Sequence, residues 1–407
     1  MRILFLSQWF QPEQCFKGLP FAKALTDRGH RVEVLTGFPN YPTGKVYQGY
    51  RVRLFQRETM EGIRVNRVAL YPSCDRSVLR RAINYLSFAF SAFFIGTWMV
   101  SRPDIIYVCN LVTLAPTAFL FRFLFGSKIV IDVLDIWPES IASSRLLNNK
   151  FTLHILDEIC KWVYRKADKL VAPSPGIKRA LINKGVSPEK IDVIYHWCDE
   201  SSIRKEMSKS CLVEDLELSD KFIILFAGTM GLVQGLDTLL DCARICMETL
   251  PNVQFLLVGG GFDRSRLEQR KIEMGLDNVT FLPSRSIELM GEIFAISDAL
   301  IVHLKDSPLF RVTIPSKTHA YLYIGKPIIM AILGDAGDLV KQAGAGVVCA
   351  PENPKDMAKA IETLWSMSDE ERNLMGLSGS QYYNKFLSFT SGVDKFEKLM
   401  LGWDVAN

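Results

Sequence analysis

The nine cysteines of this sequence include no Cys-x-x-Cys pair. Their number is odd and their spacing is irregular, so the sequence predicts neither a disulfide framework nor a structural zinc site, and it favours a reducing compartment. Cys242 and Cys246 share one helical face, which is more typical of core packing than of metal binding. No Ser-His-Asp or Cys-His arrangement indicates covalent catalysis by a serine or cysteine. The first residues already read as a strand, so we expect no export signal and a cytoplasmic protein.

Apolar runs of strand length alternate with helical spacing throughout the 407 residues. In the first half the predicted strands cover residues 2–6, 32–35, 105–109, 128–133, 169–172 and 191–194, with helices at 17–28, 79–100, 113–125, 151–166 and 176–184. In the second half the predicted strands cover residues 222–226, 253–258, 279–282, 299–302, 327–330 and 346–349. Such alternation is typical of βαβ units and parallel sheets.

The fold class that follows is α/β with two doubly wound, Rossmann-like domains. A polar, strand-free seam near residues 199–220 separates a domain over 1–205 from a domain over 206–380. A helical segment over 381–407 is expected to return to the first domain. Ligands of open parallel sheets bind beyond the carboxyl ends of the strands, so we expect the site in a cleft between the two domains.

Two features of the second half indicate a phosphate site. The sequence Pro315-Ser316-Lys317-Thr318 opens a predicted helix, whose N-terminus presents free amides to an anion while the lysine adds a positive charge. The turn 228–231 follows the first strand of this half, and its glycines let backbone amides approach a ligand closely. Such turns occur in every α/β fold, so this turn indicates a phosphate site only in combination with the predicted helix start.

The positive charge of the chain is concentrated in its first half. Residues 1–200 carry 27 Lys and Arg against 17 Asp and Glu, whereas the remainder is acidic. Eight arginines with three acidic neighbours make up much of this excess: Arg51, Arg53, Arg57, Arg64, Arg67, Arg76, Arg80 and Arg81. An arginine-rich surface favours phosphates, whether of nucleic acid, anionic lipid or a diphosphate ligand, and a solvated face is the alternative.

Residues 82–100 form the most apolar segment of the chain and contain no charge. A helix of this length spans about 28 Å, enough to cross a bilayer. The predicted strand 105–109 follows at once, and a spanning helix would keep it from sharing a sheet with strand 2–6. We therefore expect the helix to lie on the sheet or on the bilayer surface, with residues 51–100 contacting the membrane and 114–125 extending that patch.

Several motifs, taken together, identify a family. They are Arg28-Gly29-His30-Arg31-Val32-Glu33-Val34-Leu35-Thr36, the 228–235 loop, Leu257-Val258-Gly259-Gly260-Gly261, Ser297-Asp298-Ala299, and Pro315-Ser316-Lys317 through Gly325-Lys326-Pro327. This set resembles retaining glycosyltransferases of family 4, which have the GT-B fold, over essentially the whole chain. Three further motifs are similar to bacterial O-antigen or capsule transferases of the L-fucosamine type: Ser7-Gln8-Trp9-Phe10-Gln11-Pro12-Glu13, Gly37-Phe38-Pro39-Asn40-Tyr41-Pro42 and Asp135-Ile136-Trp137-Pro138-Glu139-Ser140.

The resemblance implies transfer of a sugar from a nucleotide donor to an acceptor, with retention at the anomeric carbon and without a metal. It implies no bound cofactor, a UDP-linked amino-deoxy sugar such as UDP-N-acetyl-L-fucosamine as co-substrate, a lipid diphosphate-linked saccharide as acceptor, and no nucleic-acid partner. The expected place of action is O-antigen, lipopolysaccharide or capsule biosynthesis at the inner face of the bacterial plasma membrane. The chain has no Asp-x-Asp pair, the metal clamp of nucleotide-sugar enzymes with the other common fold.

Without a metal, the leaving diphosphate has to be neutralised by amides, helix dipoles and basic side chains. The family supplies an Arg and a Lys from the first loop of the second domain, but those places hold Thr229 or Met230 and Gln234 here. Lys317 is therefore the expected replacement, followed by Arg285. Retention without an evident nucleophile favours departure of the diphosphate on the face that the acceptor attacks.

The remaining site residues are also expected from the resemblance. The family's paired glutamates fall on Val312 and Ala320, so Tyr321, Ser316 or a backbone group is expected at the ribose. The catalytic candidates are Asp135, Lys317 and Glu139; the two acids have loop bracing and a helix first turn as alternatives. The expected donor contacts are Lys17, Gly18, Gly228, Thr229, Met230, Gly231, Gln234, Gly259, Gly260, Arg285, Pro315, Ser316, Lys317, Thr318 and Tyr321.

Two other function classes compete with the transferase. A GT-B nucleotide-sugar epimerase or hydrolase would need carboxylate pairs in the cleft and no membrane-facing patch. A non-catalytic sugar-binding protein would usually be exported. Both fit the sequence less well, and His303, on a predicted strand, is expected to be a core residue.

Overall fold

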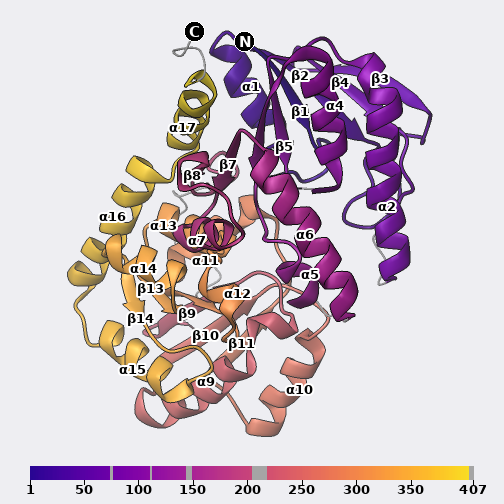
Figure 1. Ribbon diagram of the computed structural model, residues 1–407. Helices are drawn as coiled ribbons and strands as arrows, with labels where there is room; N and C mark the ends of the chain where they lie inside the picture. Colours follow the sequence, from indigo (N-terminus) through magenta and orange to yellow (C-terminus); the bar gives the residue numbers. More distant parts are fainter. Residues whose placement is uncertain (74–76, 111, 144–148, 204–217, 403–407) are drawn as a thin grey trace. The chain divides into compact units, whose positions relative to one another are not determined.

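The computed structural model describes residues 1–73, 77–110, 112–143, 149–203 and 218–402. The chain forms two compact units, Met1–Ile194 with Val393–Asn407 and Tyr195–Gly392 (Figure 1). Each unit contains one mostly parallel sheet with helices packed on it. The predicted α/β class with two Rossmann-like domains is therefore confirmed.

The unit bounds differ from the predicted ones. The sequence predicted a domain boundary at 205/206 and a C-terminal segment that rejoins the first domain from residue 381. Tertiary contacts explain the difference. The Trp197 ring packs on Phe389 at a centroid distance of 5.5 Å, and the Cys198 N–H donates to the Tyr383 hydroxyl at 3.0 Å. Both flanks of the second unit are thus joined to each other, a contact that no local polar stretch reveals.

Eight strands form the sheet of the first unit, in the order β3-β4-β2-β1-β5-β6-β7-β8. They are β1 (Arg2–Leu6), β2 (Arg31–Gly37), β3 (Phe55–Met60), β4 (Ile63–Val68), β5 (Ile105–Cys109), β6 (Lys128–Asp132), β7 (Lys169–Ala172) and β8 (Ile191–Val193). All neighbours are parallel except β3, which is antiparallel to β4. Strand β1 lies between β2 and β5, so the chain switches direction across the sheet at this point, where ligands of such sheets bind.

The β3–β4 hairpin is absent from the predicted strands. Strand β3 has four consecutive polar or charged residues between Phe55 and Met60, and β4 has three polar or charged residues among six, so the hairpin has no apolar run of the kind that marks the other strands. The turn at Glu61-Gly62 joins them with φ values of 48° and 84°, the positive values that a tight hairpin requires. Much of the predicted basic stretch is therefore β-structure.

The helices of the first unit match the predicted ones within a few residues, except for the short helix α5, which was not among them. They are α1 (Leu19–Asp27), α2 (Val78–Ser91), the π-helical turn η1 (Ala92–Gly96), α3 (Thr97–Met99), α4 (Ala115–Phe125), α5 (Glu139–Ser143), α6 (Lys150–Lys166) and α7 (Pro175–Asn183). Helix α2 continues through η1 into α3 and packs closely on the sheet. A Cβ on Gly96 would lie 2.5 Å from Leu35 Cδ2, so glycine is required at this crossing.

The C-terminal helix α17 (Phe389–Leu401) completes the first unit. The Phe396 ring packs on Phe21 at 5.1 Å and on Tyr107 at 5.8 Å between ring centroids. Glu397 accepts a hydrogen bond from Arg28 at 2.7 Å. The end of the chain therefore supplies core side chains to the unit in which the chain begins.

The sheet of the second unit has the strand order β11-β10-β9-β12-β13-β14. Its strands are β9 (Phe222–Ala227), β10 (Val253–Val258), β11 (Val279–Leu282), β12 (Ala299–His303), β13 (Ile328–Ala331) and β14 (Gly346–Val348), and all pairs are parallel. Numbered within this unit, the order is third, second, first, fourth, fifth, sixth, which is the order of the Rossmann fold. The expected ligand crevice lies where β9 meets β12.

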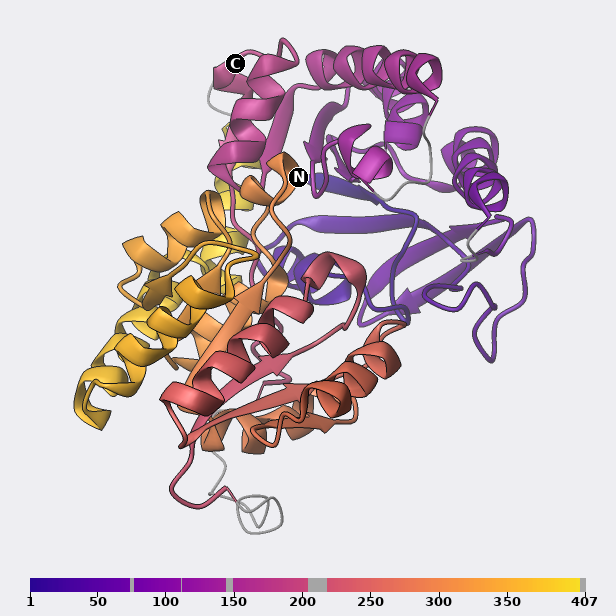
Figure 2. The same cartoon turned by 90° about the horizontal axis from the view of Figure 1, so that it is seen from below.

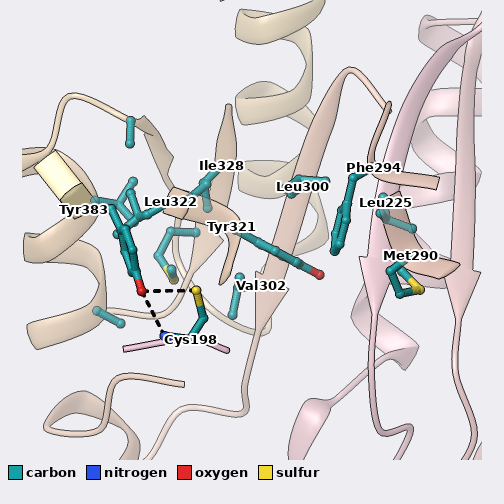
Figure 3. Packing of buried hydrophobic residues seen from close by; sticks show 14 of the residues in the cluster. Cys198, Leu225, Met290, Phe294, Leu300, Val302, Tyr321, Leu322, Ile328 and Tyr383 are labelled. Carbon is teal, nitrogen blue, oxygen red and sulfur yellow. Dashed lines mark hydrogen bonds between the residues drawn. The ribbon is translucent and has the colours of Figure 1, made fainter. Parts of the chain in front are cut away.

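Helices cover both faces of this sheet (Figures 1 and 2). Helices α9 (Asp237–Thr249), α10 (Arg264–Met274) and α15 (Pro354–Trp365) bury apolar side chains on one face. Helices α11 (Met290–Ile296), α13 (Ser316–Ile324), α14 (Asp335–Gln342) and α16 (Asp369–Phe386) do so on the other. Figure 3 shows part of the second layer, with the Tyr321 ring edge-on to Phe294 at a centroid distance of 6.0 Å.

Candidate functional site

Two glycine loops meet at the carboxyl ends of β9 and β10. Gly228, with a φ of 134°, donates its N–H to Val258 O at 2.8 Å, and Met230 donates to Gly260 O at 2.8 Å. A Cβ on Gly259 would lie 1.9 Å from Gly228 O, so only glycine lets the two backbones come this close. The expected contacts Gly259 and Gly260 thus hold the loop after β9 in place through their backbone.

Lys317 lies beside this loop in the first turn of α13. Its Nζ atom is 3.6 Å from the centre of the Phe226 ring, and a Cβ on Gly228 would lie 2.7 Å from its Cε. In the described part of the chain, no carboxylate lies within ion-pair distance of it. Burial therefore lowers the pKa of Lys317 to about 7. A desolvated cation at a helix N-terminus can accept an anion at little further cost of desolvation.

The other expected residues of the loop divide between surface and core. Thr229 and Ser316 are exposed, whereas the Met230 side chain is fully buried. Gln234 Oε1 accepts the Gly231 N–H at 3.1 Å and so closes the loop. Thr229, Ser316 and the backbone are accordingly the groups that remain open to a ligand here.

Tyr321 lies in the core. The Ala227 N–H donates to its hydroxyl at 3.0 Å, and burial raises its pKa. The hydroxyl therefore braces β9 against α13 instead of reaching toward a ribose. Thr318 is also fully buried, whereas Pro315 and Arg285 are partly exposed.

His303, expected only to fill the core, joins two loops at this edge of the sheet. Its Nε2 accepts the Glu352 N–H at 3.0 Å, so its Nδ1 carries the hydrogen and donates to Gln234 O at 2.6 Å. Burial lowers its pKa, which keeps the ring neutral. Gln234 lies 69 residues away in the sequence, so no local signal could have indicated this role.

Lys17, expected in the cleft, is part of a buried network in the first unit. Its Nζ lies 2.6 Å from Asp132 Oδ2, and neither side chain has exposed surface. The Tyr107 hydroxyl donates to the same oxygen at 2.5 Å. The adjacent Gly18 is held by a close contact, because a Cβ there would meet the Gln11 amide at 2.1 Å. Both residues therefore serve the core of this unit.

Asp135 is exposed at the end of the loop after β6, as a ligand-facing residue has to be. Its N–H donates to Asn110 Oδ1 at 3.0 Å, and Asn110 itself has a φ of 57°, which is strained for a residue with a side chain. Partial desolvation raises the pKa of the Asp135 carboxyl group, although the hydrogen bond with the Asn110 side chain lowers it. Asn110 is thus a site candidate that the motifs did not indicate.

Glu139 has a structural partner. Its carboxylate lies 2.7 Å from Lys184 Nζ, which also binds Asp157 at 2.6 Å. The pair ties α5 to α6 and α7, and half of the Glu139 side chain stays exposed.

The basic surface is smaller than the sequence indicates. Arg67 is fully buried, pairs with Glu58 at 2.5 Å and donates to Gly37 O at 2.9 Å. Arg57 donates to the backbone at the end of α3. Arg76 lies outside the described residues, and Arg51, Arg53 and Arg80 are exposed.

In the described part of the chain, no group of His, Cys, Asp and Glu is placed to hold a metal ion.

Comparison with known proteins agrees with this architecture. Residues 19–197 match the glycosyl transferase 4-like domain, and residues 212–379 match the glycosyl transferases group 1 family. The chain is 29% identical over 352 residues to the putative colanic acid biosynthesis glycosyl transferase WcaI of Escherichia coli, covering 83% of this chain and 84% of that protein. It is 22% identical to the probable glycosyltransferase WbjE of Pseudomonas aeruginosa, covering 74% and 76% of the two chains.

A solved structure with the same fold is Anabaena Alr3699/HepE in complex with UDP. It superposes with a TM-score of 0.66 at 18% identity and covers 98% of this chain and 99% of that chain. The two matched domains, the two Rossmann-like sheets and the similar structures show that the chain is a GT-B glycosyltransferase, built from a glycosyl transferase 4-like domain followed by a group 1 domain.

Proposed function

We propose that this glycosyltransferase moves a sugar from a UDP-linked nucleotide sugar to a lipid-linked saccharide, with retention and without a metal. The observation that carries the proposal is the placement of Lys317. This cation is desolvated, has no carboxylate partner among the described residues, and lies beside the Gly228 loop and the amides that open α13. A diphosphate supplies the two negative charges that such a site lacks.

The same groups account for the chemistry. As the anomeric bond stretches, negative charge develops on the leaving diphosphate, and Lys317 together with the backbone amides stabilises it. The acceptor attacks the face from which the diphosphate departs, and a diphosphate oxygen takes the acceptor proton. Asp135 of the first unit is the candidate for orienting the sugar or the acceptor hydroxyl. The enzyme then contributes position and charge stabilisation instead of a strong base.

The nature of the donor is supported in two ways. The Anabaena protein of the same fold binds UDP, and three motifs of this chain resemble transferases of the L-fucosamine type. We therefore propose a UDP-linked amino-deoxy sugar such as UDP-N-acetyl-L-fucosamine. The relative named for colanic acid biosynthesis supports an acceptor in a bacterial surface polysaccharide.

The acceptor side of the proposal rests on an apolar stripe on the first unit. Helix α2 and its continuation into α3 expose Leu79, Ile83, Leu86, Phe90, Phe94 and Trp98, and Trp98 is 88% exposed. The residues are three or four apart, so they share one face, while Phe88 and Ala92 are buried on the other. Helix α4 also exposes Phe123 and Leu124, and α6 exposes Phe151, Ile155, Ile159 and Trp162.

This stripe supports contact with a bilayer surface better than a membrane span. By length and composition Leu79–Met99 is the one helix of the described chain that could cross a membrane, and a third of it is buried. Strand β5 follows it and pairs in register with β1, which precedes it, so the helix returns to the same sheet. We propose peripheral attachment at the inner face of the bacterial plasma membrane, where the lipid-linked acceptor would lie.

A donor screen tests the proposed function. The wild-type protein is mixed with UDP, GDP and a panel of their sugars, and its melting temperature and calorimetric binding are measured. We expect UDP to stabilise the protein by about 2.7 kcal/mol at a hundredfold excess over its Kd, and the true UDP-sugar to stabilise it more than UDP at the same concentration because it binds more tightly. Transfer is then followed with a polyprenyl-diphosphate saccharide, with and without EDTA. A protein that binds neither UDP nor any UDP-sugar would contradict the proposal.

A further inference from the structure

The three motifs shared with the L-fucosamine-type transferases come together in space. Trp9 follows β1, Tyr41 follows β2, and Trp137 follows β6, so all three lie at the carboxyl-end edge of the sheet in the first unit. Tyr85 of α2 lies between two of them. Together these four rings form what we call the aromatic belt. No step of the proposed mechanism uses it.

The rings form a continuous row. The centroid distances are 5.8 Å from Tyr41 to Trp9, 6.0 Å from Trp9 to Tyr85 and 6.3 Å from Tyr85 to Trp137. Successive planes are inclined by 54°, 85° and 56°, so the rings meet in tilted or edge-to-face contacts and are not stacked in parallel. Tyr41 is 42% exposed, and the other three are partly exposed. Each ring therefore keeps some surface that a ligand can contact.

The backbone that carries the belt is held by buried and partly buried hydrogen bonds. The buried Glu13 carboxylate accepts the Tyr41 N–H at 2.7 Å, and the Ser7 hydroxyl donates to Trp9 O at 2.8 Å. Gln8 Nε2 donates to Asn84 Oδ1 at 2.6 Å, which links the residue before Trp9 to the residue before Tyr85. The row is therefore fixed before any ligand arrives, which reduces the entropy lost on binding.

The chemistry around the belt selects its ligand. Asp135, two residues from Trp137, is exposed, and its backbone N–H donates to Asn110 Oδ1. Its carboxylate accepts hydrogen bonds from hydroxyl groups but repels a phosphate backbone, so stacked nucleic-acid bases are disfavoured. Flat apolar faces beside hydroxyl acceptors match a sugar ring, which has a face of C–H groups and a rim of hydroxyls.

We propose that the aromatic belt is a saccharide-binding surface that stacks on the sugar rings of the acceptor and presents its reacting end to Asp135. This proposal rests on the proposed function, and it adds the residues that hold the acceptor. Tyr85 shares α2 with Leu86 and Phe90 of the apolar stripe, and Phe94 follows in η1. A saccharide on the belt would therefore have its lipid anchor beside the apolar stripe.

Saturation-transfer NMR on the full chain tests the belt directly. The probes are the methyl glycosides of glucose, galactose, mannose, L-fucose and N-acetylglucosamine, each added to UDP-free protein. The variants are Trp9→Leu and Tyr85→Leu, which keep an apolar side chain but remove the ring. Tyr85→Phe keeps the ring, and Trp365→Leu removes a tryptophan that is 41% exposed on the second unit.

We expect at least one glycoside to receive saturation from the wild type, with signals from its C–H face. Each Leu variant should weaken this binding by about three- to tenfold, as loss of one aromatic contact predicts, while Tyr85→Phe and Trp365→Leu should not. UDP binding should be unchanged in all variants. The idea is overturned if no glycoside binds the wild type, or if the folded Leu variants bind as well as wild type. If the wild type binds a glycoside but does not bind UDP, the proposed donor site is contradicted, whereas the proposed saccharide-binding surface is not.

A Leu variant that loses its near-UV circular dichroism has unfolded around the belt. In that case Trp137→Phe, which shrinks one outer ring, is measured in the same way. Weakened glycoside binding with an unchanged melting temperature supports the belt, and unchanged binding overturns it.

Discussion

A Cβ atom on Gly228 would lie 2.7 Å from Cε of Lys317 and 3.1 Å from its Nζ, so the lysine side chain occupies the space that the glycine leaves open. This is how a cation from α13 reaches the loop after β9. The loop has no lysine or arginine of its own between Gly228 and Gln234. The positive charge at the proposed diphosphate site therefore depends on the packing of one glycine against one lysine.

Removing that charge should weaken nucleotide binding. We expect Lys317→Ala to reduce UDP affinity by about 1.5–3 kcal/mol, the range for a charge-assisted hydrogen bond, without loss of folding. Lys359→Ala, which removes an exposed lysine of α15, is the control and should leave affinity unchanged. Isothermal titration of both variants decides between the two outcomes; equal affinities would remove Lys317 from the site.

Binding should also take up protons. Burial lowers the pKa of Lys317 from 10.5 to about 7, and a bound diphosphate restores the charged form. Between pH 7 and 9 UDP affinity should therefore fall as the pH rises, by at most about tenfold per pH unit. The binding enthalpy should vary with the ionisation enthalpy of the buffer. Lys317→Arg keeps its charge at these pH values, and its affinity should not depend on pH.

In the ligand-free protein, the lowered pKa of Lys317 should make the stability of the fold depend on pH. Since the folded lysine binds protons more weakly than the unfolded one, its contribution to stability is least favourable below pH 7 and improves as the pH rises toward 10.5. Lys317→Met should accordingly raise the melting temperature at pH 7 and do so less at pH 10. A constant difference across this range would speak against a desolvated ammonium.

We expect Asp135 to stabilise the transition state of sugar transfer and not to contribute to donor binding. Asp135→Asn should lower kcat and kcat/KM by similar factors while the Kd for UDP stays near normal. The control is Asp192→Asn, which changes a partly exposed carboxylate on β8 of the same unit. Steady-state kinetics with a melting curve for each variant provide the measurement; normal turnover would reduce Asp135 to a loop brace.

The apolar stripe should bind lipid. Replacing Phe90, Phe94 and Trp98 together by Ser should abolish most sedimentation with anionic liposomes, because three exposed aromatic side chains are lost. The matched control replaces Phe262 and Ile272, which are similarly exposed on the second unit, by Ser. If both variants lose liposome binding equally, the binding is nonspecific hydrophobic adsorption and not contact through the apolar stripe.

Electrostatic attraction should add to this binding. Arg80→Gln with Arg81→Gln should weaken binding to anionic liposomes by about 1 kcal/mol per residue at low salt, and the difference should shrink at high salt. Binding to neutral liposomes should be unaffected. If the wild type ignores anionic liposomes at low salt, the bilayer proposal fails.

Arg67 should behave as a core residue. Arg67→Met leaves the Glu58 carboxylate and the Gly37 carbonyl without their partner, and we expect a loss of about 3–5 kcal/mol in unfolding free energy. Arg53→Met, at an exposed position, should change stability by less than about 0.5 kcal/mol. Urea denaturation of both variants tests this, and a fully stable Arg67→Met protein would mean that the buried network contributes little.

The elements that the sequence predicted well are those whose signal is local. Strand 253–258 and helix 151–166 follow from apolar periodicity alone, and the structure places them at Val253–Val258 and Lys150–Lys166. The charged strands of the β3–β4 hairpin carry no such signal. Their stability comes from pairing with β2 and from the helix behind it, neither of which a sequence window contains.

The roles of charged residues were harder to predict for the same reason. A lysine at a helix start reads alike at Lys17 and Lys317, yet one is neutralised by Asp132 and the other faces no carboxylate in the described chain. Asp132 lies 115 residues from Lys17, and Glu58 and Gly37 reach Arg67 from separate strands. Distant partners decide whether a charge is available to a ligand.

The C-terminal helix has a consequence for the order of synthesis. Phe396 lies on Phe21 and Tyr107, and the Lys17 ammonium lies 4.6 Å from the centre of its ring. Because synthesis runs from the N-terminus, the first unit waits for α17, which is made only after the second unit. Until then Phe21 and the Lys17–Asp132 pair lack their cover, so a nascent chain stalled before Phe396 would be a target for chaperones and proteases, even though most of its first sheet is already complete.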